Sequence, residues 1–177
     1  MGDDRGMDAF LESVEKPAYR IALIGTGQPD DALDLVQESM FRLVEKYSQK
    51  PAEEWKALFY RILHNQIMDF HRRKSVRSRC FSWLSEDNDD EDPLQKLADP
   101  NELGPEHRLR VSSAFKQLES ALQSLSFRQQ QVFLLRSWED LSVAETARVM
   151  KCSEGSVKTH YSRALERLRE KLGDYWP

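Results

Sequence analysis

Apolar residues recur at helical spacing through most of the chain, and no stretch alternates apolar and polar residues as a strand would. The pattern predicts helices from Phe10 to Ile24, interrupted early by Pro17, from Asp31 to Tyr47, and from Pro51 into a basic segment ending near Arg79. We expect the apolar residues of the second and third helices to face a core: Leu33, Val36, Met40, Phe41, Val44 and Tyr47, then Trp55, Leu58, Phe59, Ile62, Ile67 and Phe70.

Periodicity fails from Ser85 to Pro105, where acidic residues, prolines and a glycine dominate, as expected of a solvated linker. Helices resume after Pro105, first with Val111, Phe115, Leu118, Leu122 and Leu125 on one face. The predicted fold class is therefore all-α: two small helical domains, residues 1–84 and 107–177, joined by an acidic flexible linker at 85–106.

The C-terminal part predicts a helix-turn-helix. Ser126 to Gln129 and Ser142 to Glu145 both have the capping-box pattern, the first opening a helix through Arg136 and the second a short helix to Met150. After a tight turn at 151–153, Ser153 is the expected N-cap of the last helix. Its buried side carries Val157, Tyr161, Ala164, Leu165, Leu168 and Leu172.

Composition narrows the function. The net charge of −4 argues against nucleic-acid binding only if charge is spread evenly, whereas here a basic run at 72–79 precedes an acidic run at 86–92. No segment is apolar enough to cross a bilayer, and the N-terminus lacks a signal-peptide pattern, which predicts a cytoplasmic protein that is not membrane-embedded. The only cysteines, Cys80 and Cys152, lack metal-ligand spacing, so we expect no metal and no cofactor.

The outer face of the last helix offers groups suited to phosphates and base edges. These are Ser153, Gly155, Ser156, Lys158, Thr159, Ser162 and Arg163. The string LSVAETARVMKCSEGSVKTHYSRALERLREKL resembles region 4 of bacterial sigma factors. In that family region 4 reads the minus-35 promoter element, and the resemblance implies this role for these residues.

The N-terminal half carries the second resemblance. WKALFYRILHNQIMDFHRRKSVRSR is similar to sigma regions 2.3 and 2.4, which in the family separate and read the minus-10 element. Arg61, Asn65, Met68 and Arg72 fall on one helical face, where an amide could pair with an extruded base. Arg73, Lys74 and Arg77 would hold phosphates.

The helix from Asp31 to Tyr47 resembles region 2.2, which in the family binds the coiled coil of the largest subunit of RNA polymerase. The resemblance assigns this contact to Asp34, Gln37, Glu38 and Arg42. Two positions depart from the family pattern. The aromatic order at Trp55 and 58–61 is changed, and Asp140 stands where glycine is common.

Together these segments identify the chain as resembling the extracytoplasmic-function (ECF, group 4) subfamily of the sigma-70 family. The resemblance implies an alternative sigma factor that binds RNA polymerase core, directs promoter-specific initiation and performs no catalysis. It further implies control by an anti-sigma factor, which could hold the protein at the inner membrane.

Three alternatives remain at this stage. A LuxR-type regulator would bind DNA without being a polymerase subunit, and 157–160 suits such a protein, but no receiver-like alternation of strands and helices precedes it. A metal hydrolase would need more than His64 and His71, which lie about two helical turns apart. A helical adaptor would leave the basic cluster beside a helix-turn-helix unexplained.

Overall fold

Every secondary-structure element that the structure describes is a helix, which confirms the all-α prediction. The structure, a computed structural model, describes the backbone of residues 4–81 and 113–173 and the side chains of residues 6–75 and 117–173. The predicted linker at 85–106 lies outside the described residues. The helices are α1 (Asp4–Thr26), α2 (Pro29–Tyr47), α3 (Ala52–Phe81), α5 (Ser113–Gln123), α6 (Phe127–Phe133), the π-helical turn η2 (Leu134–Trp138), α7 (Val143–Met150) and α8 (Glu154–Leu172).

The first unit is a bundle of α1, α2 and α3. Its core is formed by apolar side chains at helical spacing, among them Ile21, Leu43, Phe59, Leu63 and Ile67. The expected interruption at Pro17 was wrong, since α1 runs unbroken through it. Burial of the flanking Val14, Ala18, Ile21 and Ala22 against the bundle offsets the hydrogen bond that proline removes.

The second unit contains α5 to α8, with α8 packed on the other helices. The capping box at Ser142 is confirmed, because its hydroxyl accepts from the Glu145 amide and the Glu145 carboxylate accepts from the Ser142 amide. Ser153 caps α8 as predicted. The capping box at Ser126 was wrong: Ser126 is the N-cap by backbone geometry only, and the Gln129 side chain is buried instead.

The chain between α6 and α7 departs from a regular helix. The predicted helix through Arg136 ends at Phe133 and continues as the π-helical turn η2, which buries Leu134 and Leu135. Asp140 follows with a φ of 51°, in the left-handed region. Glycine adopts that conformation at the least cost, and aspartate adopts it more readily than most other residues.

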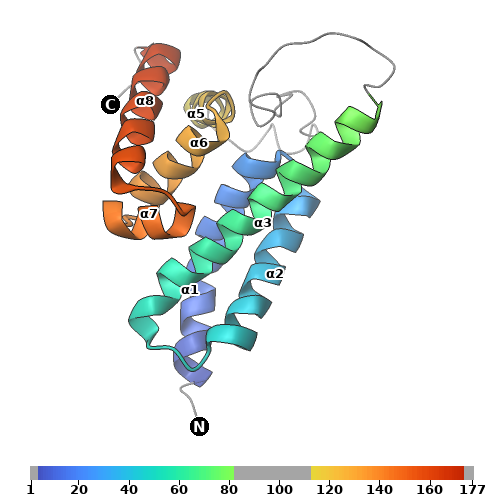
Figure 1. The fold of residues 1–177 in the computed structure, drawn as a ribbon, viewed down its shortest axis with the longest axis vertical. Coiled ribbons are helices and arrows are strands. Elements are labelled where there is room, and N and C mark those ends of the chain that lie inside the picture. The colour runs from blue at the N-terminus through green and yellow to red at the C-terminus, as the bar shows by residue number, and fades with distance from the viewer. Residues whose placement is uncertain (1–3, 82–112, 174–177) are drawn as a thin grey trace.

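The two units pack directly against each other (Figure 1). In this closed arrangement α7 lies along α3, α5 and α6 contact α1, and one apolar core continues from the first unit into the second. Polar contacts cross the same boundary. The Lys56 ammonium donates to the Glu139 carbonyl at 2.6 Å and lies 3.8 Å from its carboxylate, and His64 Nδ1 lies 3.4 Å from Gln131 Oε1.

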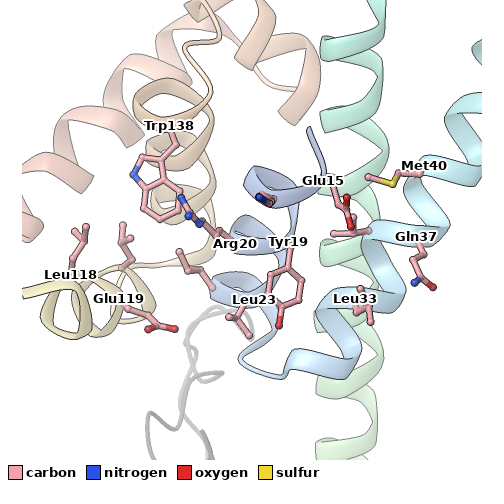
Figure 2. A pocket seen from close by; sticks show the side chains of 14 residues that line it. Glu15, Tyr19, Arg20, Leu23, Leu33, Gln37, Met40, Leu118, Glu119 and Trp138 are labelled. Carbon is pink, nitrogen blue, oxygen red and sulfur yellow. The ribbon is translucent and has the colours of Figure 1, made fainter. Parts of the chain in front are cut away.

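An apolar groove of about 510 Å³ opens at the boundary of the units (Figure 2). Tyr19 and Leu23 of α1 and Leu33 of α2 line one side, and Leu118 of α5 and Trp138 of η2 line the other. Charged side chains also line the groove, including Lys16, Arg20 and Glu119. Because both units supply its walls, the groove depends on the closed arrangement.

Candidate polymerase and nucleic-acid interfaces

The outer face of α2 presents both polar and apolar side chains to solvent. Asp34, Gln37, Glu38 and Arg42, the residues predicted for polymerase binding, are all exposed, and Arg42 pairs with Glu38 at 2.6 Å. Three residues expected in the core are exposed as well, so that part of the prediction was wrong. These are Leu33, Phe41 and Val44, at 46%, 65% and 40% exposure.

The reason for this correction lies in the geometry of the bundle. Ala32, Val36, Ser39 and Leu43 face α1 and α3, so the core face of α2 is rotated from the one that the larger apolar residues suggested. Leu33, Gln37, Met40 and Val44 then repeat at the spacing of a coiled-coil seam, with Met40 half-buried. Large apolar side chains exposed on one face are typical of a protein-binding surface.

One face of α3 forms a polar stripe beside the end of α2. Arg61, Asn65 and Met68 are half-buried and Arg72 is exposed, at the helical spacing that the sequence predicted. The Arg61 guanidinium lies 5.9 Å from the centre of the Tyr47 ring and donates to its hydroxyl at 3.3 Å. Arg72 contacts Asp69 at 3.5 Å, a solvent-exposed pair that offers little stability.

The basic end of α3 continues this stripe. Arg73 and Lys74 are exposed, and Arg77 belongs to α3 although its side chain lies outside the described ones. Tyr47 is a residue that sequence reasoning missed at this site, because it was expected to face the core. Its aromatic ring beside a cation is the kind of surface on which an unpaired base stacks.

The aromatic residues at the start of α3 pack in the core. Trp55, Phe59 and Tyr60 are buried, and Phe10 of α1 lies 5.8 Å from Trp55 and 6.2 Å from Phe59, ring centre to ring centre. Burial, reinforced by the Glu139 carboxylate, raises the pKa of the Tyr60 phenol. The altered aromatic order therefore affects packing within the first unit and, at Tyr60, the contact with Glu139, more than it affects the exposed stripe.

The outer face of α8 carries the side chains predicted for the minus-35 element. Ser153, Gly155, Lys158, Thr159, Ser162 and Arg163 are exposed and Ser156 is half-buried. Two hydroxyls at the start of the helix already make hydrogen bonds within it. Ser153 Oγ accepts from the Ser156 amide at 3.1 Å, and the Thr159 hydroxyl donates to the Gly155 carbonyl at 3.0 Å. Lys158 and Arg163 make no ion pair within the described part of the chain.

Two cations that sequence reasoning did not assign, Arg128 and Lys151, lie near His64 of α3, and Arg128 also lies near His160 of α8. Burial, together with Arg128 and Arg163, lowers the pKa of the His160 ring, so the neutral ring lies in a cationic neighbourhood. Lys151, in the turn before α8, has a left-handed φ of 52°. The positive charges of Lys151 and Arg128 both contribute to lowering the pKa of His64 of α3. Arg128 belongs to α6 and Lys151 to the turn before α8, so helical spacing within α8 could assign neither of them.

His64 and His71, the histidines considered as metal ligands, pack against an aromatic ring instead. His64 stacks on Phe127 with ring centres 5.6 Å apart, and His71 meets the same ring edge-on at 5.0 Å. Within the described residues no group of three or more metal-ligating side chains comes together. No described helix is long and apolar enough to span a membrane.

Comparisons with known proteins decide the family. The model of sigma-70 region 2 matches residues 8–77, and the model of sigma-70 region 4 matches residues 115–168. The RNA polymerase sigma factor SigV of Bacillus subtilis is 30% identical over 155 residues, which cover 87% of this chain and 83% of SigV. The chain belongs to the sigma-70 family.

Further comparisons place this sigma factor in the extracytoplasmic-function group. The ECF RNA polymerase sigma factor SigX of Bacillus subtilis is 28% identical over 170 residues, covering 92% of this chain and 81% of SigX. The fold resembles that of the sigma factor RpoE from Bartonella quintana, solved with the anti-sigma factor NepR, with a TM-score of 0.66, 21% identity and coverage of 93% and 96%. The protein is an alternative sigma factor, which binds RNA polymerase core and promoter DNA to start transcription.

The match to region 2 also decides against the LuxR-type alternative. That alternative shares only the helix-turn-helix, whereas the matched N-terminal half is the part by which a sigma factor differs from a simple DNA-binding regulator. The sigma factor acts as a transcription initiation factor.

Proposed function

We propose that three surfaces of this sigma factor divide the work of initiation. The outer face of α2 binds the coiled coil of the largest polymerase subunit, the polar stripe of α3 captures the opened minus-10 strand, and the outer face of α8 reads the minus-35 duplex. The proposed domains are residues 1–84 and 107–177, joined through 85–106. The factor itself supplies no catalytic group and acts in the cytoplasm.

The observation that carries this proposal is the stripe on α3. Arg61, Asn65, Met68 and Arg72 point away from the buried residues of their own helix, at least partly open to solvent. An amide flanked by guanidinium groups combines base-edge hydrogen bonding with phosphate attraction, the two needs of single-strand recognition. The adjoining Tyr47 ring supports a stacking contact to an unpaired base.

The α2 surface fits a helical partner. Leu33, Met40, Phe41 and Val44 offer apolar contact, while Asp34 and Glu38 add charge at the edge. Apolar side chains ringed by polar ones are the usual composition of a reversible protein interface. The seam spacing favours a coiled-coil partner over a flat surface.

We further propose that an anti-sigma factor controls this protein through the groove between the units. RpoE, whose fold is similar, was solved with an anti-sigma factor bound. The groove is lined mainly by apolar side chains with several charged ones among them, which suits an amphipathic helix. Its walls include Leu33 and Gln37 of the α2 surface, so an occupant would compete with polymerase.

Run-off transcription with purified polymerase core on fragmented genomic DNA tests the proposal. Addition of the sigma factor should create new transcript starts that share an upstream bipartite motif. The variant Asn65→Ala should weaken those starts, and the control Glu12→Ala, an exposed residue of α1 outside the three proposed surfaces, should not. No new starts, with no association with core, would overturn the proposed function.

A further inference from the structure

The closed arrangement cannot be the one that reads a promoter. This inference rests on the function proposed above, in which α3 and α8 bind two separate promoter elements. The minus-35 and minus-10 elements lie about 25 base pairs, or roughly 85 Å, apart at 3.4 Å per base pair. The longest helix, α3, has 30 residues and spans about 45 Å at 1.5 Å per residue. Because α7, which precedes the reading helix, packs along α3, the units must separate before both elements are bound.

The contact that must break includes an aromatic side chain held between two histidines. Phe127, the first residue of α6, is buried between His64 and His71 of α3, stacked on one ring and edge-on to the other. Both histidines are buried as well. His64 faces Gln131 at 3.4 Å, and neither nitrogen of His71 makes a hydrogen bond of normal geometry to the described part of the chain.

The electrostatic surroundings disfavour a charge on either ring. Burial lowers the pKa of His64 to about 4, with Arg128 and Lys151 adding to the effect and Gln131 partly offsetting it. Burial lowers the pKa of His71 to about 4, partly offset by the Gly25 backbone, with Lys74 lowering it further. The charged groups that act on the rings from α3, α6 and the end of α7 are thus all cations.

We propose that His64, His71 and Phe127 form a proton-sensitive latch that holds the two units closed while both rings are neutral and releases them when the rings are protonated. A protonated ring must either remain buried beside cations or move into water, and separation of α6 from α3 exposes it. The latch therefore couples uptake of protons to separation of the domains, before any contact with polymerase or DNA.

The direction of the pH effect follows from the lowered pKa values. A group whose pKa is lower in the closed form stabilises that form fully above its ordinary pKa of 6.5 and progressively less as the pH falls toward 4. At about pH 5.5, each ring should shift the balance toward the open form by about tenfold if opening restores the ordinary pKa.

One titratable group at the same boundary acts in the opposite direction. Burial raises the pKa of the Glu139 carboxyl, which lies against Tyr60 and Lys56, so acid tends to stabilise the closed form there. This effect begins as the pH falls through the raised pKa of Glu139 in the closed form, and it partly offsets the histidine effect. The variant Glu139→Gln removes the opposing effect and should make opening steeper in pH.

Energy transfer between dyes on the full chain tests the latch. The chain has only two cysteines, Cys80 near the end of α3 and Cys152 in the turn before α8, one in each unit. Transfer efficiency should fall reversibly between pH 7.5 and about pH 5.5, and the double variant His64→Gln/His71→Gln should lose this dependence. An unchanged efficiency in the natural protein, or an equal fall in the double variant, would overturn the proposal.

A second measurement covers the case in which the double variant is already open. Proton titration of the histidine rings by NMR should give low values in the natural protein and values near 6.5 for His64 and His71 in Phe127→Ala. Rings that keep their low pKa in Phe127→Ala would show that the first unit alone buries them, which contradicts the latch. Neither measurement involves DNA or polymerase. A result that overturns the latch therefore does not affect the proposed function, which the run-off experiment tests on its own.

Discussion

The two long faces of α3 carry similar kinds of side chain and have different roles. One face is at least partly open to solvent and the other is covered mainly by the second unit. The open face carries Arg61, Asn65, Met68 and Arg72, and the covered face carries Lys56, Tyr60, His64 and His71. Residue type alone does not separate them, since cations and hydrogen-bonding groups occur on both. What separates them is whether another helix lies opposite, which is a property of the whole fold.

This difference predicts that the covered face determines stability and the open face determines transcription. A substitution on the covered face should lower the free energy of unfolding, because it removes buried contacts. A substitution on the open face should leave that energy unchanged and weaken promoter use. The first two predictions below test this separation, and the last two extend the comparison of open and covered positions to the second unit.

The largest effect is expected from removal of the Phe127 ring. Phe127→Ala should lower the free energy of unfolding by about 3 kcal/mol, since a buried phenyl ring is replaced by a cavity. The matched variant Phe41→Ala removes the same ring from an exposed site and should cost less than about 0.5 kcal/mol. Denaturant unfolding of both variants gives the comparison. Equal losses would mean that Phe41 is not an exposed residue of α2.

The next effect concerns the open face of α3. Asn65→Ala should reduce run-off transcription about tenfold, in keeping with the 1–3 kcal/mol that a good base contact contributes. Its free energy of unfolding should stay within about 0.5 kcal/mol of the natural protein. A comparable fall in stability would instead assign Asn65 to the core and weaken the proposed stripe. Binding to a single-stranded minus-10 oligonucleotide by the polymerase holoenzyme should fall in parallel.

The sequence predicted the open surfaces better than the covered one. The stripe from Arg61 to Arg72 and the α8 face follow from helical spacing alone, since one period determines both the buried and the exposed side. The role of His64 and His71 depends on Phe127, which lies more than fifty residues further along the chain, and no local pattern reports such a contact. The exposure of Phe41 was missed for a related reason: small residues such as Ala32 and Ser39 occupy the core face of α2.

A smaller effect is expected on the α8 face. Lys158→Ala should reduce the slope of log affinity against log salt for duplex minus-35 DNA by about 0.9, because one phosphate contact is lost. The matched variant Lys171→Ala, an exposed lysine in the last turn of α8, should leave the slope unchanged. Titrations of the holoenzyme at several salt concentrations measure both slopes. An equal reduction in both variants would show that net charge alone, and not the outer face of α8, determines affinity.

The smallest effect separates two serines that the sequence presents as equivalent. Ser142→Ala should cost about 1 kcal/mol in the free energy of unfolding, because its hydroxyl accepts from the Glu145 amide at 3.2 Å. Ser126→Ala should cost only a few tenths of that value, since the Ser126 side chain makes no capping hydrogen bond. The Gln129 side chain that would complete the second box is buried, whereas Glu145 is free to reach back to its cap. If Ser126→Ala proved as costly as Ser142→Ala, the Gln129 side chain would have to turn outward, and the packing next to Phe127 would differ from the closed arrangement described above.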